Sequence, residues 1–263
     1  MNLKGYFQEI ANAIHQNADD SRTPIKGSDF PQAIKAACNH QASNGYENGL
    51  KVGKDDAYNE FWDEYQNKGN REHYSYAFGG KGWTDKTFKP KYDIILGSTV
   101  GTCLFAYSKI TDLVDILERQ GVVLDTSQST DLGSIFNTCS NLINAPLVDA
   151  SNAKHCGSIF FNCTKLESAK LKLKDDGSQT FSSAFSYCNN LYDFEIVGGL
   201  IGQDINFKNS PLSQASLLSV INALASDVTG KTLTISNKIS HLLSYTTVKN
   251  AIAKKPNWTI SVV

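Results

Sequence analysis

Apolar positions recur at a fixed spacing between residues 132 and 191. A Phe, a Cys and a Leu, each three residues from the next, occur together three times, and the copies begin 24 and 25 residues apart. A period between about 20 and 29 residues with such a frame indicates a leucine-rich-type solenoid, in which stacked turns bury the recurring side chains against each other. The nine repeat-core residues are Phe136, Cys139, Leu142, Phe160, Cys163, Leu166, Phe185, Cys188 and Leu191.

A second sequence motif, which contains polar residues, precedes each of the first two copies. Leu124-Asp125-Thr126-Ser127 precedes Phe136, and Val148-Asp149-Ala150-Ser151 precedes Phe160, again 24 residues apart. Aspartates in register predict a turn in which each side chain accepts hydrogen bonds from nearby backbone N–H groups. A calcium site is the alternative, although the sequence lacks the ligand-dense loops that calcium needs.

One degenerate copy is predicted before the three clear copies and another after them. The first has Leu, Tyr and Ile at the three positions, and the last has Asn, Asn and Leu. Their residues are Leu104, Tyr107, Ile110, Asn206, Asn209 and Leu212.

Other patterns predict the elements around the repeats. We expect a first strand at 92–96 and an inserted helix at 111–120, which Gly121 ends. Ser213 is expected to cap a helix, and the spacing of the following apolar residues predicts a strand, a short helix and a final strand at 258–262. The residues expected to face inward from the inserted helix are Leu113, Ile116 and Leu117. The patterns behind the later elements are a shared helix face, a strand alternation and a short helix, formed respectively by Leu217, Leu218, Ile221 and Leu224, by Leu233 and Ile235, and by Val248 and Ile252. This tail is expected to close the open end of the stack.

The N-terminal 40 residues show two apolar helical faces, at 3–15 and 28–38. Two short helices are too small for a stable core of their own, so we expect them to pack on each other and also on another copy or a partner protein. The predicted attachment residues are Tyr6, Phe7, Ile10, Ile14, Phe30 and Ile34.

Residues 41–68 form a connecting segment of a different kind. Three glycines stand four residues apart at 45, 49 and 53, which indicates either a semi-flexible connector or close approach of another helix. Aromatic residues at 58, 61, 62 and 65 predict an amphipathic helix that caps the solenoid, and a ligand site is the alternative for this aromatic stripe. The expected organisation is therefore an attachment segment (1–40), this connecting helix (41–68), the solenoid with its N-terminal cap (69–212) and a C-terminal cap (213–263).

Composition narrows the function classes. The net charge is −1 and 19% of the residues are charged, so no long-range field attracts nucleic acid or anionic lipid. Six cysteines are too few for a disulfide scaffold in 263 residues, and neither a signal-peptide pattern at Met1 nor a membrane-spanning apolar run occurs. We therefore expect free, buried thiols in a protein made in a reducing cytosol; disulfides between equivalent cysteines of adjacent turns are the alternative.

The sequence contains no constellation that indicates catalysis. Its five histidines lack metal-ligand spacing, and the glycine run at 79–82 lacks the ending of a phosphate-binding loop. His155 and Cys156 are neighbours, and neighbouring side chains of a strand face opposite ways. We expect no enzyme, no cofactor, no metal and no nucleic-acid partner.

Several stretches of the chain resemble known protein families. Residues 10–14 and 25–34 (Ile-Ala-Asn-Ala-Ile and Ile-Lys-Gly-Ser-Asp-Phe-Pro-Gln-Ala-Ile) are similar to the start of tail and appendage proteins of phages and prophages of Gram-positive gut bacteria, in which an Arg often stands where this chain has His15. Ser210–Ser213 is similar to the helix opening in the C-terminal part of the same proteins. The repeat at 92–212 resembles BspA-like leucine-rich repeats.

The resemblance implies an α+β fold: a BspA-like solenoid with short parallel strands, preceded by N-terminal helices and closed by a C-terminal α/β cap. It implies a structural or adhesive component of a phage or prophage particle, located on the virion. The N-terminus would attach to other particle proteins or to further copies of the chain, and the solenoid would bind a host surface receptor or decorate the particle. A bacterial cell-surface or secreted leucine-rich-repeat interaction protein is the alternative.

Overall fold

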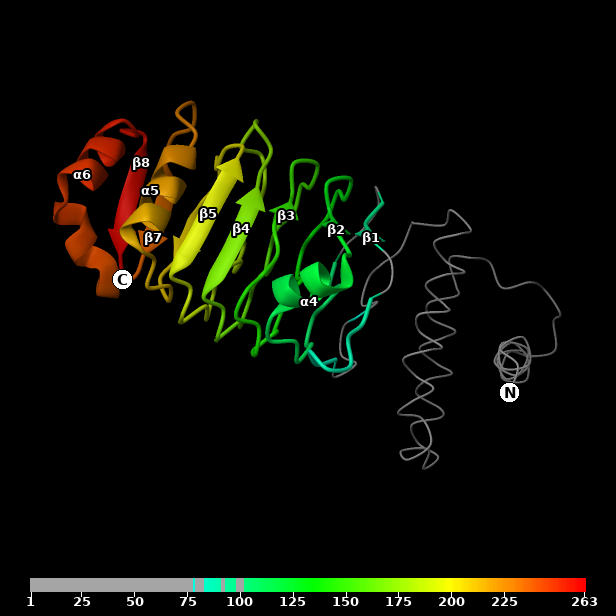
Figure 1. Cartoon of the computed structure of the whole chain (residues 1–263). Helices are drawn as coiled ribbons and strands as arrows, with labels where there is room; N and C mark the ends of the chain where they lie inside the picture. Colours follow the sequence, from blue (N-terminus) through cyan, green and yellow to red (C-terminus); the bar gives the residue numbers. More distant parts are fainter. Residues whose placement is uncertain (1–77, 79–82, 91–92, 98–101) are drawn as a thin grey trace, which may run out of the picture. The chain divides into compact units, whose positions relative to one another are not determined.

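The protein is a mixed helix-and-strand structure with short parallel strands in small sheets (Figure 1). The computed structural model describes residue 78 and residues 83–90, 93–97 and 102–263, all of which belong to the compact unit Tyr65–Val263. The predictions for residues 1–68, including the six attachment residues, lie outside the described residues.

Strand pairing follows the order of the chain. Each strand of the described part pairs in parallel with the strand that comes next in its sheet, so successive segments lie side by side. The strands are β1 (Ile94–Ile95) and β2 (Leu124–Asp125) in one sheet, β3 (Val148–Asp149), β4 (Ser168–Lys172) and β5 (Asp193–Gly198) in a second, and β6 (Ile205–Phe207), β7 (Lys231–Ile235) and β8 (Trp258–Val262) in a third.

A second parallel ladder runs through the segments that carry the recurring phenylalanines. The backbone N–H of Phe105 donates to Ile135 at 2.8 Å, that of Phe136 to Ile159 at 3.0 Å, and that of Phe160 to Ala184 at 3.0 Å. The same contact therefore repeats from one repeat unit to the next. A buried backbone group needs such a partner, and the neighbouring unit supplies it.

These segments have an unusual backbone that also repeats. In each, two residues other than glycine have positive φ, and they stand two positions before and two positions after the phenylalanine. The left-handed conformation costs such residues about 1 kcal/mol or more, so the inter-unit hydrogen bonds must hold it in place. The residues are Cys103, Tyr107, Ser134, Thr138, Ser158, Asn162, Ser183 and Tyr187.

Five buried phenylalanines form a column: four come from these segments and the fifth, Phe207, from β6. Neighbouring ring centroids are 5.4 Å apart for Phe105–Phe136 and Phe136–Phe160, 6.1 Å for Phe160–Phe185 and 4.4 Å for Phe185–Phe207. Aromatic pairs at such distances contribute about 0.5–1.5 kcal/mol beyond the burial of their area. The column is thus the centre of the apolar core.

The two degenerate copies begin one residue later than predicted. Phe105 and Phe207, rather than Leu104 and Asn206, occupy the phenylalanine position, because their rings stack in the column. Ser108 and Ser210 take the cysteine position: their N–H groups donate to the carbonyls of Phe105 and Phe207, as the cysteine N–H groups do in the clear copies. Tyr107, predicted to be a core residue, is 56% exposed. Asn206 is exposed and Asn209 half-buried, whereas Ile110 and Leu212 are buried as expected.

The inserted helix is confirmed as α4 (Leu113–Gln120), with Leu113, Ile116 and Leu117 buried. The Asp112 side chain accepts from the N–H of Asp115 at 3.0 Å and caps its first turn. Gly121 ends it with φ of 63°, a conformation that glycine adopts without steric cost.

The C-terminal elements are confirmed as α5 (Gln214–Ala223), β7, α6 (Thr246–Ala253) and β8, with the Ser213 side chain capping α5. The pattern did not predict the 3-10 helix η1 (Asn237–Ser244). Leu218 and Ile252 are half-buried.

Helix α5 lies against β5 and takes the place of a further strand (Figure 1). The hydroxyl of Ser216 accepts from the N–H of Phe194 at 2.8 Å, and that of Ser219 accepts from the N–H of Ile196 at 2.9 Å. These two serines satisfy backbone donors of the sheet edge, so β5 has a protected edge.

Candidate functional site

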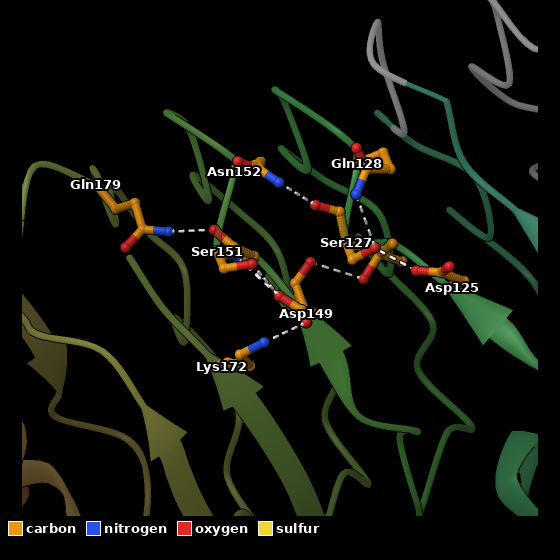
Figure 2. Close-up of polar contacts among 10 residues, drawn as sticks. Asp125, Ser127, Gln128, Asp149, Ser151, Asn152, Lys172 and Gln179 are labelled. Carbon is orange, nitrogen blue, oxygen red and sulfur yellow. Dashed lines mark hydrogen bonds and ion pairs between the residues drawn. The ribbon is translucent and has the colours of Figure 1, made fainter. Parts of the chain in front are cut away.

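The most regular polar feature follows the ends of β2, β3 and β4 (Figure 2). Ser127 N–H donates to Asp125 at 2.9 Å, and Ser151 N–H donates to Asp149 at 3.0 Å. The predicted turn role of these aspartates is confirmed, and Asp176 repeats it with Ser178 at 2.9 Å.

Side chains of this polar edge also join neighbouring repeat units. The Asn152 amide donates to the carbonyl of Ser127 at 2.7 Å (Figure 2). The Thr126 hydroxyl donates to the carbonyl of Asp149 at 2.9 Å. The wholly buried Gln179 donates to the carbonyl of Ala150 and accepts from the N–H of Lys174. Because these groups bond to the protein itself, the edge is first of all a structural ladder.

Two carboxylates of the edge, Asp149 and Asp176, are held in their charged form. Burial acts to raise the pKa of Asp149, but hydrogen bonds from Ser151 and Lys172 outweigh it and keep this pKa below its ordinary value. The hydroxyl of Ser178 is the main cause that lowers the pKa of Asp176 to about 2. Both groups are ionised at neutral pH and are therefore poor general acids.

The polar edge does not gather metal ligands. No group of three or more His, Cys, Asp or Glu residues that could hold a metal ion occurs among the described residues. Asp149 instead forms an ion pair with Lys172 at 2.9 Å, and Asp176 forms one with Lys174 at 3.0 Å. Each of these carboxylates is therefore already paired with a lysine.

The repeat cysteines form a buried column of hydrogen-bonded thiols. Cys139 Sγ donates to the carbonyl of Phe105 at 3.0 Å, and Cys163 Sγ and Cys188 Sγ donate to Phe136 and Phe160 at 3.0 and 3.1 Å. Burial raises the pKa of Cys139 to about 11 and that of Cys188 to about 12, and raises the pKa of Cys163 as well. A thiol in this state is a weak donor inside the core and a poor nucleophile.

Native thiol reactivity should reflect this burial. All five described cysteines are free and four are buried, whereas Cys103 is half-buried. In a thiol titration at pH 8 without denaturant, we expect rapid reaction from at most Cys103 and Cys38, the sixth cysteine, which lies outside the described residues. All six should react once the chain is unfolded. Rapid native reaction of more than two thiols, or an intact mass showing disulfides, would contradict the buried-thiol column.

His155 and Cys156 do not form a pair. His155 is exposed and its Nδ1 lies 3.1 Å from the Thr180 hydroxyl, while Cys156 is wholly buried. Burial, followed by the nearby charge of Asp131, raises the pKa of Cys156 to about 12. The two side chains face opposite ways, as expected for neighbours on an extended segment.

Ser210 stands at the cysteine position of the column but lacks the recurring hydrogen bond. Its hydroxyl is wholly buried and has no hydrogen-bond partner among the described residues, whereas the equivalent cysteine thiols each reach a phenylalanine carbonyl. An unsatisfied buried hydroxyl costs about 1–3 kcal/mol.

Replacing Ser210 by Cys should therefore stabilise the protein by about 1 kcal/mol, because the larger thiol fits the repeat geometry and is less costly to bury. Chemical denaturation of Ser210→Cys and Ser210→Ala tests this. The alanine variant removes the hydroxyl without adding a donor, so it should lie between the wild type and the cysteine variant. A cysteine variant less stable than the wild type would show that Ser210 does not occupy an equivalent position.

The nine repeat-core residues named from the sequence are all buried, with exposed fractions of 0 or 1%. Sequence reasoning missed Phe105, Phe207, Gln179, Ser216 and Ser219. Phe105 and Phe207 had a signal in the sequence, because each is an aromatic residue one position from the predicted start of its copy. The buried Gln179 and the two edge-capping serines had no such signal.

The outside of the phenylalanine segments differs from unit to unit. The equivalent positions after each phenylalanine hold Tyr107, Thr138, Asn162 and Tyr187. Tyr187 is 52% exposed and meets the half-buried Phe161 edge-to-face at 5.6 Å. The phenylalanine position thus stays the same from unit to unit, whereas the position two residues after it varies.

Comparisons with protein-family models, with curated proteins and with solved structures give no significant match. In the part of the chain that the structure describes, no helix has both the length and the hydropathy needed to cross a membrane.

Proposed function

We propose that this chain is a non-enzymatic structural or adhesive component of a phage or prophage particle. Residues 92–212 form a BspA-like, leucine-rich-repeat-type solenoid that is displayed for host-surface binding or decoration. The N-terminal segment attaches the chain to other particle proteins or to further copies of itself. The resemblance of residues 10–14 and 25–34 to phage appendage proteins supports the particle assignment.

One observation carries the display part of the proposal: the recurring residues point inward and the varying residues point outward. Phenylalanine rings stack from unit to unit, and the cysteine thiols bond the preceding unit. The matching outer positions hold residues as different as Thr138 and Tyr187. Repeat scaffolds that present binding surfaces are built in this way, because the core fixes the backbone and leaves the exterior free to vary.

A bacterial cell-surface or secreted interaction protein is the second candidate. The repeat resemblance alone supports it equally well, since BspA-like repeats also occur in bacterial surface proteins. Location separates the two candidates: one protein belongs to particles and the other to the cell envelope.

The test separates particles from envelopes of the producing bacterium on a density gradient, after prophage induction. Antibodies raised against the described unit then locate the chain in the fractions and, by immunogold labelling, on particles. We expect the full chain in the particle fraction. Recovery in the envelope fraction would favour the surface-protein candidate, and recovery in neither would contradict both.

A second arm tests attachment with a variant that lacks only Met1 to His40. The compact unit Tyr65–Val263 remains intact in this variant, so its cooperative unfolding should be unchanged. We expect the variant to stay free while the full chain joins particles or oligomers, measured by light scattering and by pull-down with particle proteins. Equal assembly of the two forms would place attachment elsewhere in the chain.

A further inference from the structure

Strand β8 has an open edge. It is the terminal strand of the sheet β6–β7–β8, and in the described part of the chain no strand pairs with its other side. Val263 donates to Ile235 at 3.1 Å and accepts from Asn237 at 2.7 Å, so its backbone groups face β7. Because these groups alternate sides along a strand, the N–H and C=O groups of Ile260 and Val262 point to the open edge.

Strand β8 itself has none of the features by which proteins commonly prevent a further strand from pairing with an open edge. The strand reads Trp-Thr-Ile-Ser-Val, with neither a proline nor a charge, and its register with β7 is regular. Proteins commonly block edges with charges, prolines, bulges or a covering element. The contrast lies within the same molecule, since α5 supplies Ser216 and Ser219 to the edge of β5.

The apolar row beside the edge is only partly covered. Ile260 and Val262 stand opposite Leu233 and Ile235, which are wholly buried. Ile260 is half-buried and Val262 is 40% exposed, although they belong to the same row. This apolar row of β8 is thus left partly uncovered within the described part of the chain. A further strand with apolar side chains at alternate positions would cover both residues.

The stretch of chain that contains β8, residues 228–263, has basic but no acidic side chains. Residues 228–263 contain five lysines, one histidine and no Asp or Glu, in a protein whose net charge is −1. The exposed Lys254 stands just before β8, and the exposed Lys238 follows Asn237, which bonds Val263. The neighbouring segments add the carboxylates of Asp204, which accepts from the Thr232 N–H, and Asp227.

We propose that the open edge of β8 binds an extended acidic segment of another protein. The segment adds a strand to the sheet, bonds the outward backbone groups of Ile260 and Val262, and lays apolar side chains on their row. Its acidic residues lie near Lys238 and Lys254. Pairing of two β8 edges would bring the lysines of both copies together, which disfavours a second copy of this chain. This inference does not depend on the proposed particle location.

Binding is measured with the full chain and fluorescent peptides of about ten residues, longer than the strand they would join. The main probe alternates glutamate and valine. The comparison probes are alternating lysine and valine, glutamate alone, and a single-stranded oligonucleotide. We expect the glutamate–valine peptide to bind at least about tenfold more tightly than each comparison probe, because only it offers strand, charge and apolar row together.

Two matched pairs of variants test the geometry. Val262→Pro removes an outward N–H without touching the β7 ladder, and Val262→Ala shortens the side chain but keeps that N–H. The proline variant should bind the glutamate–valine peptide about tenfold more weakly than the alanine variant. Lys238→Glu with Lys254→Glu should weaken it about tenfold or more, whereas the same reversal at the exposed Lys109 and Lys154 should leave it nearly unchanged.

Thermal unfolding of each variant verifies that the sheet remains folded. Failure of the glutamate–valine peptide to bind overturns the proposal. Equal binding of polyglutamate or the oligonucleotide overturns it in favour of a general polyanion site. Concentration-dependent self-association that Val262→Pro abolishes overturns it in favour of a second copy.

Discussion

Phe160→Ala is expected to lower the free energy of unfolding by about 3–5 kcal/mol, the range for removing a wholly buried aromatic side chain. Phe160 lies at the centre of the phenylalanine column, with ring centroids 5.4 Å from Phe136 and 6.1 Å from Phe185. The backbone around it is fixed by inter-unit hydrogen bonds, including the one its carbonyl accepts from Cys188. The site therefore has little freedom to collapse onto the cavity.

The neighbouring Phe161 provides a matched control. It is half-buried and meets the exposed Tyr187 at 5.6 Å, outside the column. Phe161→Ala removes the same atoms, but from a site open to water, and should cost about 1 kcal/mol. Urea denaturation of both variants measures the difference. If the two substitutions destabilise the protein equally, the column is not the centre of the core.

The sequence predicted the repeat because three residue types kept their spacing in three copies. The same rule misplaced the outer copies. Phe105 and Phe207 stand in the column, but Ile110 and Leu212 follow them after five residues instead of the six of the clear copies. Counting six residues back from Ile110 or Leu212, as in the clear copies, leads to Leu104 or Asn206, one residue before the phenylalanine. Only the ring contacts and backbone bonds show the true register.

Other features had no local signal at all. Serines at 134 and 158 adopt positive φ, a conformation for which sequence reasoning looks to glycine or asparagine. Hydrogen bonds from their N–H groups to the next unit hold it there. The edge-capping Ser216 and Ser219 likewise look like ordinary polar residues of a helix until β5 is placed beside them.

The polar edge was partly predictable. Asp125 and Asp149 stand in register, and this alone predicted their turn role, because an aspartate side chain reaches backbone donors two residues ahead. Asp176 stands 27 residues after Asp149 instead of 24, so the repeat spacing did not predict the same turn role for it. Gln179, which joins two units from a buried position, depends on neighbours that are distant in sequence.

Gly199→Ala is expected to be the most damaging change that adds a single methyl group. Gly199 has φ of 85°, and a Cβ there would lie 2.2 Å from the backbone oxygen of Leu173. That approach is held on both sides, since Leu173 N–H donates to Gly198 and Leu200 N–H donates to Lys174, each at 2.8 Å. Since neither backbone can move without breaking these bonds, we expect a loss of about 3 kcal/mol or more.

Gly230→Ala isolates the cause of this loss. Gly230 has a similar φ of 67°, but no atom lies within 4 Å of a Cβ built there. Its substitution adds the strain of a left-handed alanine without a clash and should cost about 1 kcal/mol. Thermal and urea denaturation of both variants separate the two contributions. Equal losses would mean that the segments around Leu173 and Gly199 can move apart, and that the parallel contact between these neighbouring units is looser than their hydrogen bonds indicate.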